Sequence, residues 1–315
     1  MARVGAGEAV ALEGVWRAFG KVQAVADLSF VVPSGTVTVL LGPNGAGKTT
    51  VVRLVTGALH THAGRVQTLG IDPGSEASGS EVRRRCGVVP ARPALYDRLT
   101  GLDNLRYAAD LFQVDPALSD ARITEAADRF GILDALDQTV GGYSTGMRAR
   151  LALARAVLHE PDLLLLDEPT AGLDPESARA VLRLIDEMAD DGKTVLMCTH
   201  LLLEAEGLAD QVIVMDKGHA MVSGSPKELT RRYWPATRVL LDADNPALLD
   251  FAATLPYVRG YERNGVAVVD LDDDTQVPDL VDALVAAGAR LTRVEPRTPT
   301  LEELYFAIRK QHRGQ

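Results

Sequence analysis

The nine residues at positions 42–50, GPNGAGKTT, constrain this chain more than any other stretch. An apolar run at 36–41 precedes them and is typical of a buried parallel strand. A helical pattern begins directly afterwards, at Lys48. The glycines let backbone N–H groups converge on an anion, and the helix N-terminus adds positive potential there. A flexible turn is the simpler interpretation, but the strand–turn–helix context favours a phosphate-binding loop.

Two side chains of this loop fit the chemistry of a nucleoside triphosphate. Lys48 can reach the β- and γ-phosphates, and the Thr49 hydroxyl can ligate a magnesium ion. We therefore expect ATP and Mg²⁺ to bind here. The expected nucleotide contacts in the loop are Gly42, Pro43, Asn44, Gly45, Ala46, Gly47, Lys48, Thr49 and Thr50.

Polar side chains also follow two later apolar strands. The leucine run at 163–166 ends in Asp167 and Glu168, and the strand expected at 194–199 is followed by His200. In open α/β sheets, ligands bind off the carboxyl ends of the strands. The acids could be solvated turn residues and the histidine structural, but beside a phosphate loop we interpret them as functional groups.

Composition excludes some classes of partner. The 315-residue chain has a formal net charge of −10, which argues against a nucleic-acid binder and against direct adhesion to an anionic membrane. Its cysteines, Cys86 and Cys198, are expected to be reduced and structural. No apolar run has the length of a membrane span. We expect a cytoplasmic protein whose membrane attachment comes through a partner.

Periodicity predicts two domains. Residues 1–224 form an α/β domain that contains a helical subdomain at about 97–159, and 225–236 form a linker with a helix. Residues 237–315 follow the order β-α-β-β-α-β, a small α+β ferredoxin-like domain with a hairpin at Asn264-Gly265. This second domain contains no convergent catalytic residues, so we expect a regulatory or packing module.

Three residues have two interpretations each. Phe19 precedes the phosphate strand at a turn and either packs or stacks on an adenine. Ser144 is a plausible N-cap of a helix, and Asp174 before Pro175 is another. The local pattern alone does not decide between capping and ligand binding.

These motifs resemble the nucleotide-binding subunit of an ABC transporter, over roughly residues 9–224. Residues 42–50 match the Walker A loop and 163–167 match Walker B. The resemblance implies an ATPase of mixed-sheet P-loop fold, in which Asp167 positions magnesium with Thr49 and Glu168 is the catalytic glutamate.

The remaining family motifs follow in order. Residues 171–174, ending in Asp174, match the D-loop; His200 matches the switch histidine, and Phe19 matches the aromatic that stacks on adenine. The segment 143–147, Tyr-Ser-Thr-Gly-Met, aligns with the signature Leu-Ser-Gly-Gly-Gln and keeps only Ser144 and Gly146 of its small residues. This variant and the C-terminal module resemble the subfamily that pairs with ABC-2-type drug or sodium exporters.

The resemblance implies a homodimer that sandwiches two ATP molecules between the Walker loop of one copy and the signature of the other. Closure and reopening would then drive an ABC-2-type permease, which places the chain on the inner face of the cell membrane. The family also has a glutamine that touches magnesium and links to the permease. Here Ala91 stands at that position, so the linkage needs another route.

Two other classes of function remain. A soluble ABC-type ATPase of translation or DNA repair usually has tandem cassettes or long coiled coils, whereas this chain has one Walker loop and no sustained heptads. A regulatory protein that binds nucleotide without hydrolysis would not need Glu168 and His200. The sequence does not name the transported substrate, and it favours export over import only through the signature and the C-terminal module.

Overall fold

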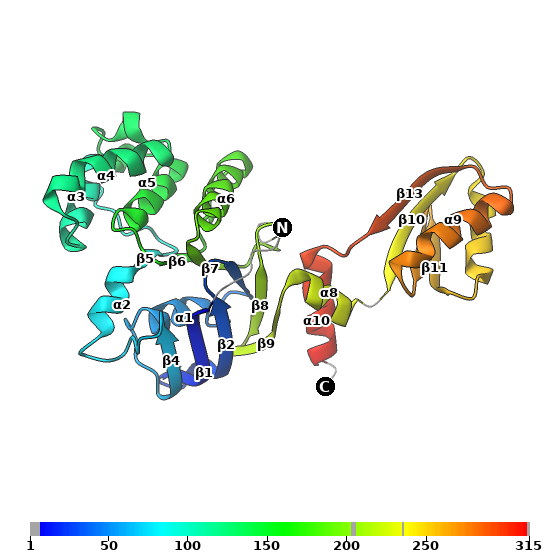
Figure 1. Ribbon diagram of the computed structural model, residues 1–315, viewed down its shortest axis with the longest axis horizontal. Coiled ribbons are helices and arrows are strands. Elements are labelled where there is room, and N and C mark those ends of the chain that lie inside the picture. Colours follow the sequence, from blue (N-terminus) through cyan, green and yellow to red (C-terminus); the bar gives the residue numbers. More distant parts are fainter. Residues whose placement is uncertain (1–6, 203–205, 235, 314–315) are drawn as a thin grey trace. The chain divides into compact units, whose positions relative to one another are not determined.

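A computed structural model describes residues 7–202, 206–234 and 236–313 of the chain. The chain divides into two compact units, Met1–Ser225 and Pro226–Gln315 (Figure 1). The expected domain ends at 1–6 and 314–315 lie outside the described residues. Within the described ranges, no helix combines the length and the apolar character needed to cross a bilayer.

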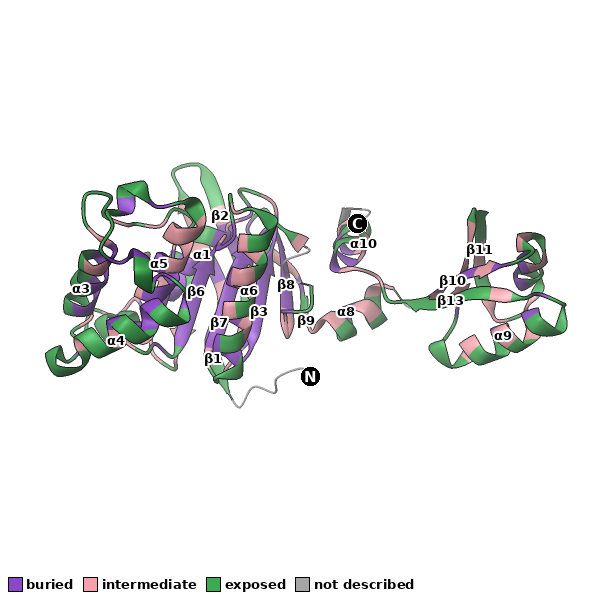
Figure 2. Ribbon diagram, turned by 90° about the horizontal axis from the view of Figure 1, so that it is seen from above, coloured by how far each residue is buried: buried purple, intermediate pink, exposed green. Residues whose placement is uncertain are grey.

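The first unit is built on a six-stranded sheet in the order β5-β6-β7-β3-β8-β9. Its first five strands are parallel, and β9 runs antiparallel to β8. Strands β3, β6 and β7 are buried along their whole length because their residues are almost all apolar (Figure 2). The strand bounds are β3 Val37–Leu41, β5 Cys86–Val89, β6 Leu163–Asp167, β7 Thr194–Thr199, β8 Gln211–Asp216 and β9 His219–Gly224.

A second, antiparallel sheet has the order β2-β1-β4. Its strands are β1 Glu8–Phe19, β2 Val22–Pro33 and β4 Ala63–Thr68. Helix α1 (Lys48–Val55) contributes Val51, Val52 and Leu54 to a core shared with both sheets. The start of α1 is therefore fixed in position by apolar packing on either side.

Helices fill the rest of the first unit. Those between β5 and β6 form the helical region expected at about 97–159, and α6 follows β6. The bounds are α2 Gly79–Arg85, α3 Gly101–Leu111, α4 Pro116–Arg129, α5 Thr145–Val157 and α6 Pro175–Asp190, with short 3-10 turns η1 Leu133–Ala135 and η2 Val140–Gly142.

The second unit contains an antiparallel sheet in the order β11-β12-β10-β13. Its strands are β10 Thr237–Ala243, β11 Val258–Asn264, β12 Val266–Leu271 and β13 Leu291–Arg297. Helix α9 (Val277–Ala286) and the 3-10 helix η3 (Pro246–Thr254) pack on this sheet, with η4 (Asp274–Gln276) leading into α9. The topology is ferredoxin-like, as the sequence predicts, although the first of its helices is a 3-10 helix rather than an α-helix.

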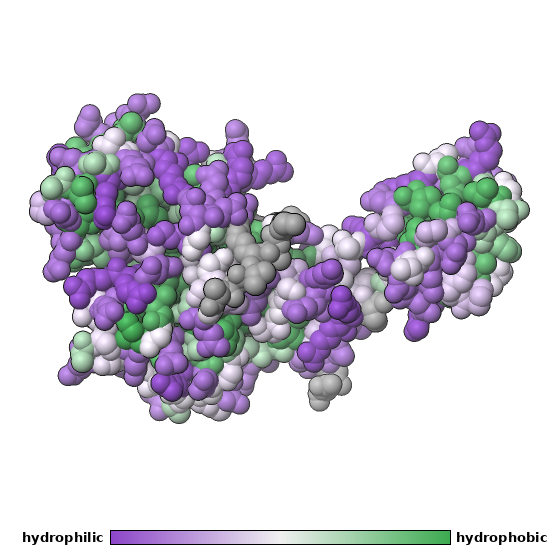
Figure 3. Space-filling model, viewed as in Figure 1, coloured by the Kyte–Doolittle hydropathy of each residue, from purple (hydrophilic) through white to green (hydrophobic). Residues whose placement is uncertain are grey.

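Two helices lie outside this sheet unit. The residues expected as a linker contain α8 (Pro226–Tyr233), which contacts the terminal helix α10 (Leu301–Arg313). Both helices belong to the second compact unit, so this stretch is part of that unit. Figure 3 shows hydrophobic residues gathered on one side of the second unit, and Val285 of α9 is among its exposed apolar side chains.

Candidate nucleotide site

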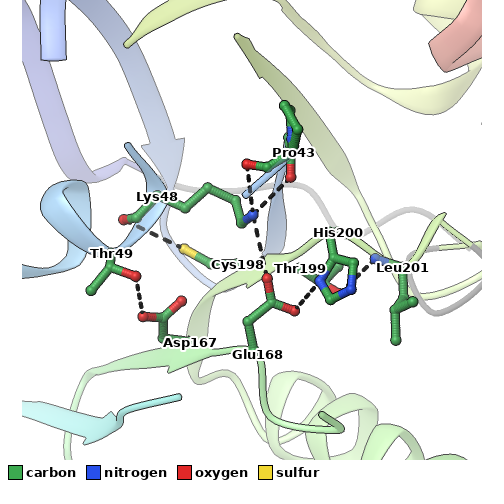
Figure 4. Close-up of polar contacts among 10 residues, drawn as sticks. Pro43, Lys48, Thr49, Asp167, Glu168, Cys198, Thr199, His200 and Leu201 are labelled. Carbon is green, nitrogen blue, oxygen red and sulfur yellow. Dashed lines mark hydrogen bonds and ion pairs between the residues drawn. The ribbon is translucent and has the colours of Figure 1, made fainter. Parts of the chain in front are cut away.

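The parallel register brings three loops to one edge of the six-stranded sheet. Leu41, the last residue of β3, pairs with Thr199 of β7, and Asp167 of β6 pairs with Cys198. The residues that follow these strands, Gly42, Glu168 and His200, therefore leave the sheet at the same edge. The phosphate loop, Glu168 and His200 lie together, as expected from the sequence (Figure 4).

The phosphate loop has a conformation that only glycine allows. Gly47 caps α1 with φ of +106°, and a Cβ there would lie 2.4 Å from the carbonyl oxygen of Ala24. Helix α1 then begins at Lys48, whose side chain is 6% exposed. Its Nζ donates to the carbonyl oxygen of Gly42 at 2.7 Å and to that of Pro43 at 3.5 Å. The ammonium group thus lies across the mouth of the loop.

Thr49 and Asp167 form a pair of hard oxygen donors. The Thr49 hydroxyl donates to Oδ2 of Asp167 at 2.7 Å. Burial raises the pKa of the Asp167 carboxyl, and the hydrogen bond from Thr49 acts in the opposite direction. Across the described ranges, no group of three or more His, Cys, Asp or Glu residues is placed to hold a metal. The pair fits Mg²⁺, which usually takes one or two protein oxygens and completes its shell with water and phosphate.

Glu168 contacts both Lys48 and His200. Its Oε1 lies 3.3 Å from Lys48 Nζ, and its Oε2 lies 2.8 Å from Nδ1 of His200. The backbone of Glu168 has φ of +53°, which is uncommon for a residue with a side chain. Its N–H donates to the carbonyl oxygen of Cys198 at 2.8 Å, which holds this conformation. Such strained positions concentrate at functional sites.

Ser144, Gly146 and Asp174 form a second group. Ser144 caps α5 by accepting from the N–H of Met147 at 3.2 Å, and Asp174 caps α6 by accepting from Glu176 and Ser177. Hydrogen bonds from Ser177 and the helix N-terminus hold the pKa of Asp174 below its usual value. A Cβ on Gly146 would lie 3.2 Å from the Ser177 hydroxyl, so the two helix starts are adjacent. Among the described residues, no hydrogen bond or ion pair joins this group to Lys48 or Glu168.

Phe19 ends β1 with a side chain that is 43% exposed. The guanidinium carbon of Arg17 lies 5.0 Å from the centroid of its ring. Arg17 also donates to the carbonyl oxygen of His60 at 2.9 Å, which anchors it. The ring is therefore held by a cation and is not buried in the core.

A cavity of about 1060 Å³ extends from the Thr49–Asp167 pair. Its wall includes Thr49, Asp167 and Ala91. Apolar side chains such as Leu111 and Phe112 line the middle. Arginines from three segments complete the wall: Arg53, Arg83, Arg84 and Arg92. From the sequence, Arg92 is a candidate for coupling to the permease, with Tyr96, because both lie near Ala91. No local motif joins Arg92 to the other three arginines.

Comparison with known proteins agrees with this geometry. Residues 25–171 match the ABC transporter family, and residues 224–308 match the C-terminal domain of DrrA1-3-like ATP-binding proteins. The daunorubicin resistance ATP-binding protein DrrA2 of Streptomyces coeruleorubidus is 39% identical over 309 residues, covering 96% of this chain and 95% of the relative. The Nod factor export ATP-binding protein I of Rhizobium sp. is 33% identical, and the match covers 95% of this chain and 96% of the relative.

The fold is shared with a solved ATP-binding subunit of an ABC transporter. The match has a TM-score of 0.65 and 27% sequence identity, and it covers 71% of this chain and 92% of the solved chain. The match to DrrA2 extends over both units. The chain therefore belongs to the ATP-hydrolysing subunits of ABC transporters, in the subfamily that carries a DrrA-like C-terminal domain.

Proposed function

We propose that this chain powers an ABC-2-type efflux permease by hydrolysing ATP between two copies of itself. The observation that carries the proposal is the convergence of Lys48, the Thr49–Asp167 pair and Glu168 at one sheet edge. Relatives are named for daunorubicin resistance and Nod factor export. We infer that this chain also serves export of a small molecule, from the inner face of the cell membrane.

The residues at the sheet edge have distinct roles in hydrolysis. Lys48 exchanges its carbonyl partners for the β- and γ-phosphates, and backbone N–H groups of residues 42–50 hold the remaining oxygens. Glu168 accepts hydrogen bonds from the attacking water and orients it. His200, already hydrogen-bonded to Glu168, holds the γ-phosphate and the water in line.

Magnesium is held by Thr49 and Asp167 in this proposal. The metal supplies charge neutralisation at the phosphates when it is bound. Asp167 is only 2% exposed, so its carboxylate is in a low-dielectric environment where a divalent cation favours the ionised form. The Thr49 hydroxyl can give up its bond to Asp167 and present a lone pair.

The second copy supplies the other half of each site. Ser144 and Gly146 stand at the N-terminus of α5, where the helix dipole and free N–H groups favour an anion. We propose that they face the γ-phosphate held by the partner, with Asp174 beside them at the interface. ATP then contributes contacts that exist only in the closed pair, so its binding shifts the population towards closure.

Phe19 is proposed to stack on the adenine. Arg17 lies over the ring at 5.0 Å, so one face is engaged by a cation and the ring is 43% exposed. An adenine on the free face would add stacking of the kind seen between aromatic groups.

The cavity beside Ala91 is proposed to receive the permease. Its apolar middle and its four arginines, Arg53, Arg83, Arg84 and Arg92, fit an amphipathic cytoplasmic helix that carries acidic residues. The cavity wall also contains Thr49 and Asp167, so a helix seated there is close to the metal ligands. This arrangement gives a route between permease and phosphate site that does not need a glutamine at position 91.

The test is purification of the tagged chain from membranes in mild detergent. We expect a membrane protein with about six spanning helices to co-purify and to raise the ATPase rate of the complex. Reversing Arg83 and Arg84 to Glu should remove this partner and leave the rate of the isolated subunit unchanged. Arg65→Glu, on strand β4, is the matched control. Co-purification of ribosomes or a DNA-repair complex instead would favour a soluble ABC-type ATPase.

A further inference from the structure

Asp97 and Arg148 form an ion pair between two segments that are far apart in the sequence. Oδ1 of Asp97 lies 2.6 Å from Nη2 of Arg148. The backbone of Asp97 makes a second link, because its carbonyl oxygen accepts from the N–H of Gly141 at 2.9 Å. Asp97 comes shortly after residues 90–95, here called the Ala91 loop, which follow strand β5. Gly141 and Arg148 lie on either side of the signature at 143–147.

The Ala91 loop is itself fastened to the helical region next to Asp97. Asn104 of α3 is 2% exposed and binds both backbone groups of Tyr96, accepting from its N–H at 2.8 Å and donating to its carbonyl oxygen at 3.1 Å. Arg155 of α5 donates to the carbonyl oxygen of Ala94. These bonds tie the loop to α3 and α5 directly beside Asp97.

The segment before the signature is fastened in the same way. Arg148 donates through Nη1 to the carbonyl oxygen of Val140 at 3.0 Å. The buried hydroxyl of Tyr143 donates to the carbonyl oxygen of Ala135 at 2.6 Å, and it occupies the space that a side chain on Gly101 would need. Ser144 follows Tyr143 directly, so its position depends on these bonds.

We propose that Asp97 and Arg148 are positioning residues that connect the Ala91 loop to the signature serine. The inference rests on the proposed function, since it assumes that Ser144 acts on the nucleotide of the partner copy. The path follows the backbone from Ala91 on the cavity wall to Asp97, and then crosses through the hydrogen bonds of Asp97 to Gly141 and to Arg148 on α5. Through it, occupation of the cavity changes how Ser144 meets the γ-phosphate across the dimer.

The exposure of the pair suits such a connection. The Arg148 side chain is 28% exposed and that of Asp97 is 60% exposed, so solvent screens the attraction and the pair can break and re-form. The second bond of Arg148, to Val140, keeps the guanidinium in place when Asp97 moves. The ion pair can therefore adjust with the loop without unfolding the helical region.

A charge-reversal cycle on the full-length protein tests the pair. Asp97→Arg and Arg148→Asp should each lower the turnover number for ATP by roughly threefold to tenfold, whereas the Kd for ATP and the unfolding midpoint stay at the parent values. The double variant restores opposite charges and should turn over ATP faster than either single variant, although the bond from position 148 to the carbonyl oxygen of Val140 stays lost. Arg150→Asp, two residues further along α5, is the matched control and should not change turnover. Losses that add in the double variant would overturn the proposal.

A mixed-copy assay locates the effect. One copy carries Lys48→Ala and the other Ser144→Arg, so that only one composite site keeps an intact Walker loop and an intact signature. Arg148→Asp should lower the rate when placed on the Lys48→Ala copy, which donates the signature, and leave it unchanged on the Ser144→Arg copy. Equal losses in both placements would contradict the proposed link between Asp97, Arg148 and Ser144, but not the shared ATP site. A mixture without any ATPase activity would instead contradict the proposed ATP site shared between two copies.

Discussion

The ammonium group of Lys48 lies 3.3 Å from the carboxylate of Glu168, so the cation expected to hold the γ-phosphate is paired with the carboxylate expected to activate water. Both side chains are largely buried, at 6% and 14% exposed, and screening by solvent is weak there. In the proposed mechanism, entry of a triphosphate separates them. The phosphate replaces the carboxylate as the partner of Lys48, and Glu168 is released towards the water while it stays bonded to His200.

Replacing Glu168 with Gln should therefore separate binding from hydrolysis. The amide cannot polarise water as a carboxylate does, so we expect hydrolysis to fall by about 100-fold or more. ATP affinity should be maintained or increased, because the variant loses the anion that competes with phosphate for Lys48. Single-turnover hydrolysis and equilibrium titration with ATP and magnesium measure the two quantities.

The same variant tests the paired site. ATP that is bound but not hydrolysed should hold two copies together, which size-exclusion chromatography with ATP and magnesium can detect. Lys48→Ala is the matched control, since it removes the phosphate-facing cation and should lose both nucleotide affinity and the dimer. A Glu168→Gln protein that binds ATP and stays monomeric would contradict the sandwich.

Truncation after Ser225 should leave a folded core that binds ATP. Every proposed nucleotide contact lies in the first compact unit, which ends at that residue. Circular dichroism and ATP titration of the truncated chain measure folding and affinity. If the core is folded but its affinity is lost, the second unit completes the nucleotide site.

His159 should make the stability of the first unit depend on pH. Its Nε2 lies 3.1 Å from the carbonyl oxygen of Cys86, and its ring stacks on Phe112 with centroids 4.0 Å apart. Among the described residues, its buried Nδ1 has no hydrogen-bond partner. Burial lowers the pKa of His159, and the positive charges of Lys193 and Arg122 lower it further, against the bond to Cys86. As the pH falls through about 6.5, the unfolded chain takes up the proton first, so the free energy of unfolding decreases.

Urea unfolding at about pH 7.5 and about pH 5.5 measures this loss. In a Trp234→Phe background, the fluorescence of Trp16 reports on the first unit alone. His159→Phe keeps a stacking ring but cannot titrate, so it should lose less stability on acidification, while starting about 1 kcal/mol lower because Cys86 loses a donor. The exposed His219→Phe is the control. If the parent and the His159→Phe variant lose the same free energy of unfolding on acidification, His159 is not the group that causes the pH dependence.

The elements around the phosphate site were predictable because their signals are local. Apolar strands at 37–41 and 163–167 and a glycine-rich turn specify a buried parallel sheet with a phosphate loop, so the polar residues after these strands are expected at one edge of the sheet. The order and register of β3, β6 and β7 come from the structure. The C-terminal strands were also predictable from alternation and the Asn264-Gly265 turn. The 3-10 geometry of Pro246–Thr254 was not, since its pattern does not distinguish a 3-10 helix from an α-helix.

Contacts between distant segments could not be predicted from the sequence. The Asp97–Arg148 pair joins residues separated by 51 positions, and nothing in either local pattern selects the partner. The arginines around the Ala91 cavity come from three segments that only the fold assembles. The pairing of Lys48 with Glu168 likewise depends on how far β6 extends beside the phosphate loop.

Ala91 gives the last prediction, because it occupies the wall of the cavity that also contains Thr49 and Asp167. Alanine has no ligand atom, so we expect a water to take the place of a glutamine oxygen on the metal, at a cost of roughly 0–2 kcal/mol. Ala91→Gly should therefore keep the ATPase rate within a few-fold of the parent, whereas Thr49→Ala and Asp167→Ala should nearly abolish it. Ala91→Gln should be tolerated and lower the magnesium concentration needed for half-maximal rate. ATPase rates across a magnesium titration compare the four variants. If Ala91→Gly is as inactive as Asp167→Ala, the side chain at position 91 shapes the site directly and the water-filled interpretation is wrong.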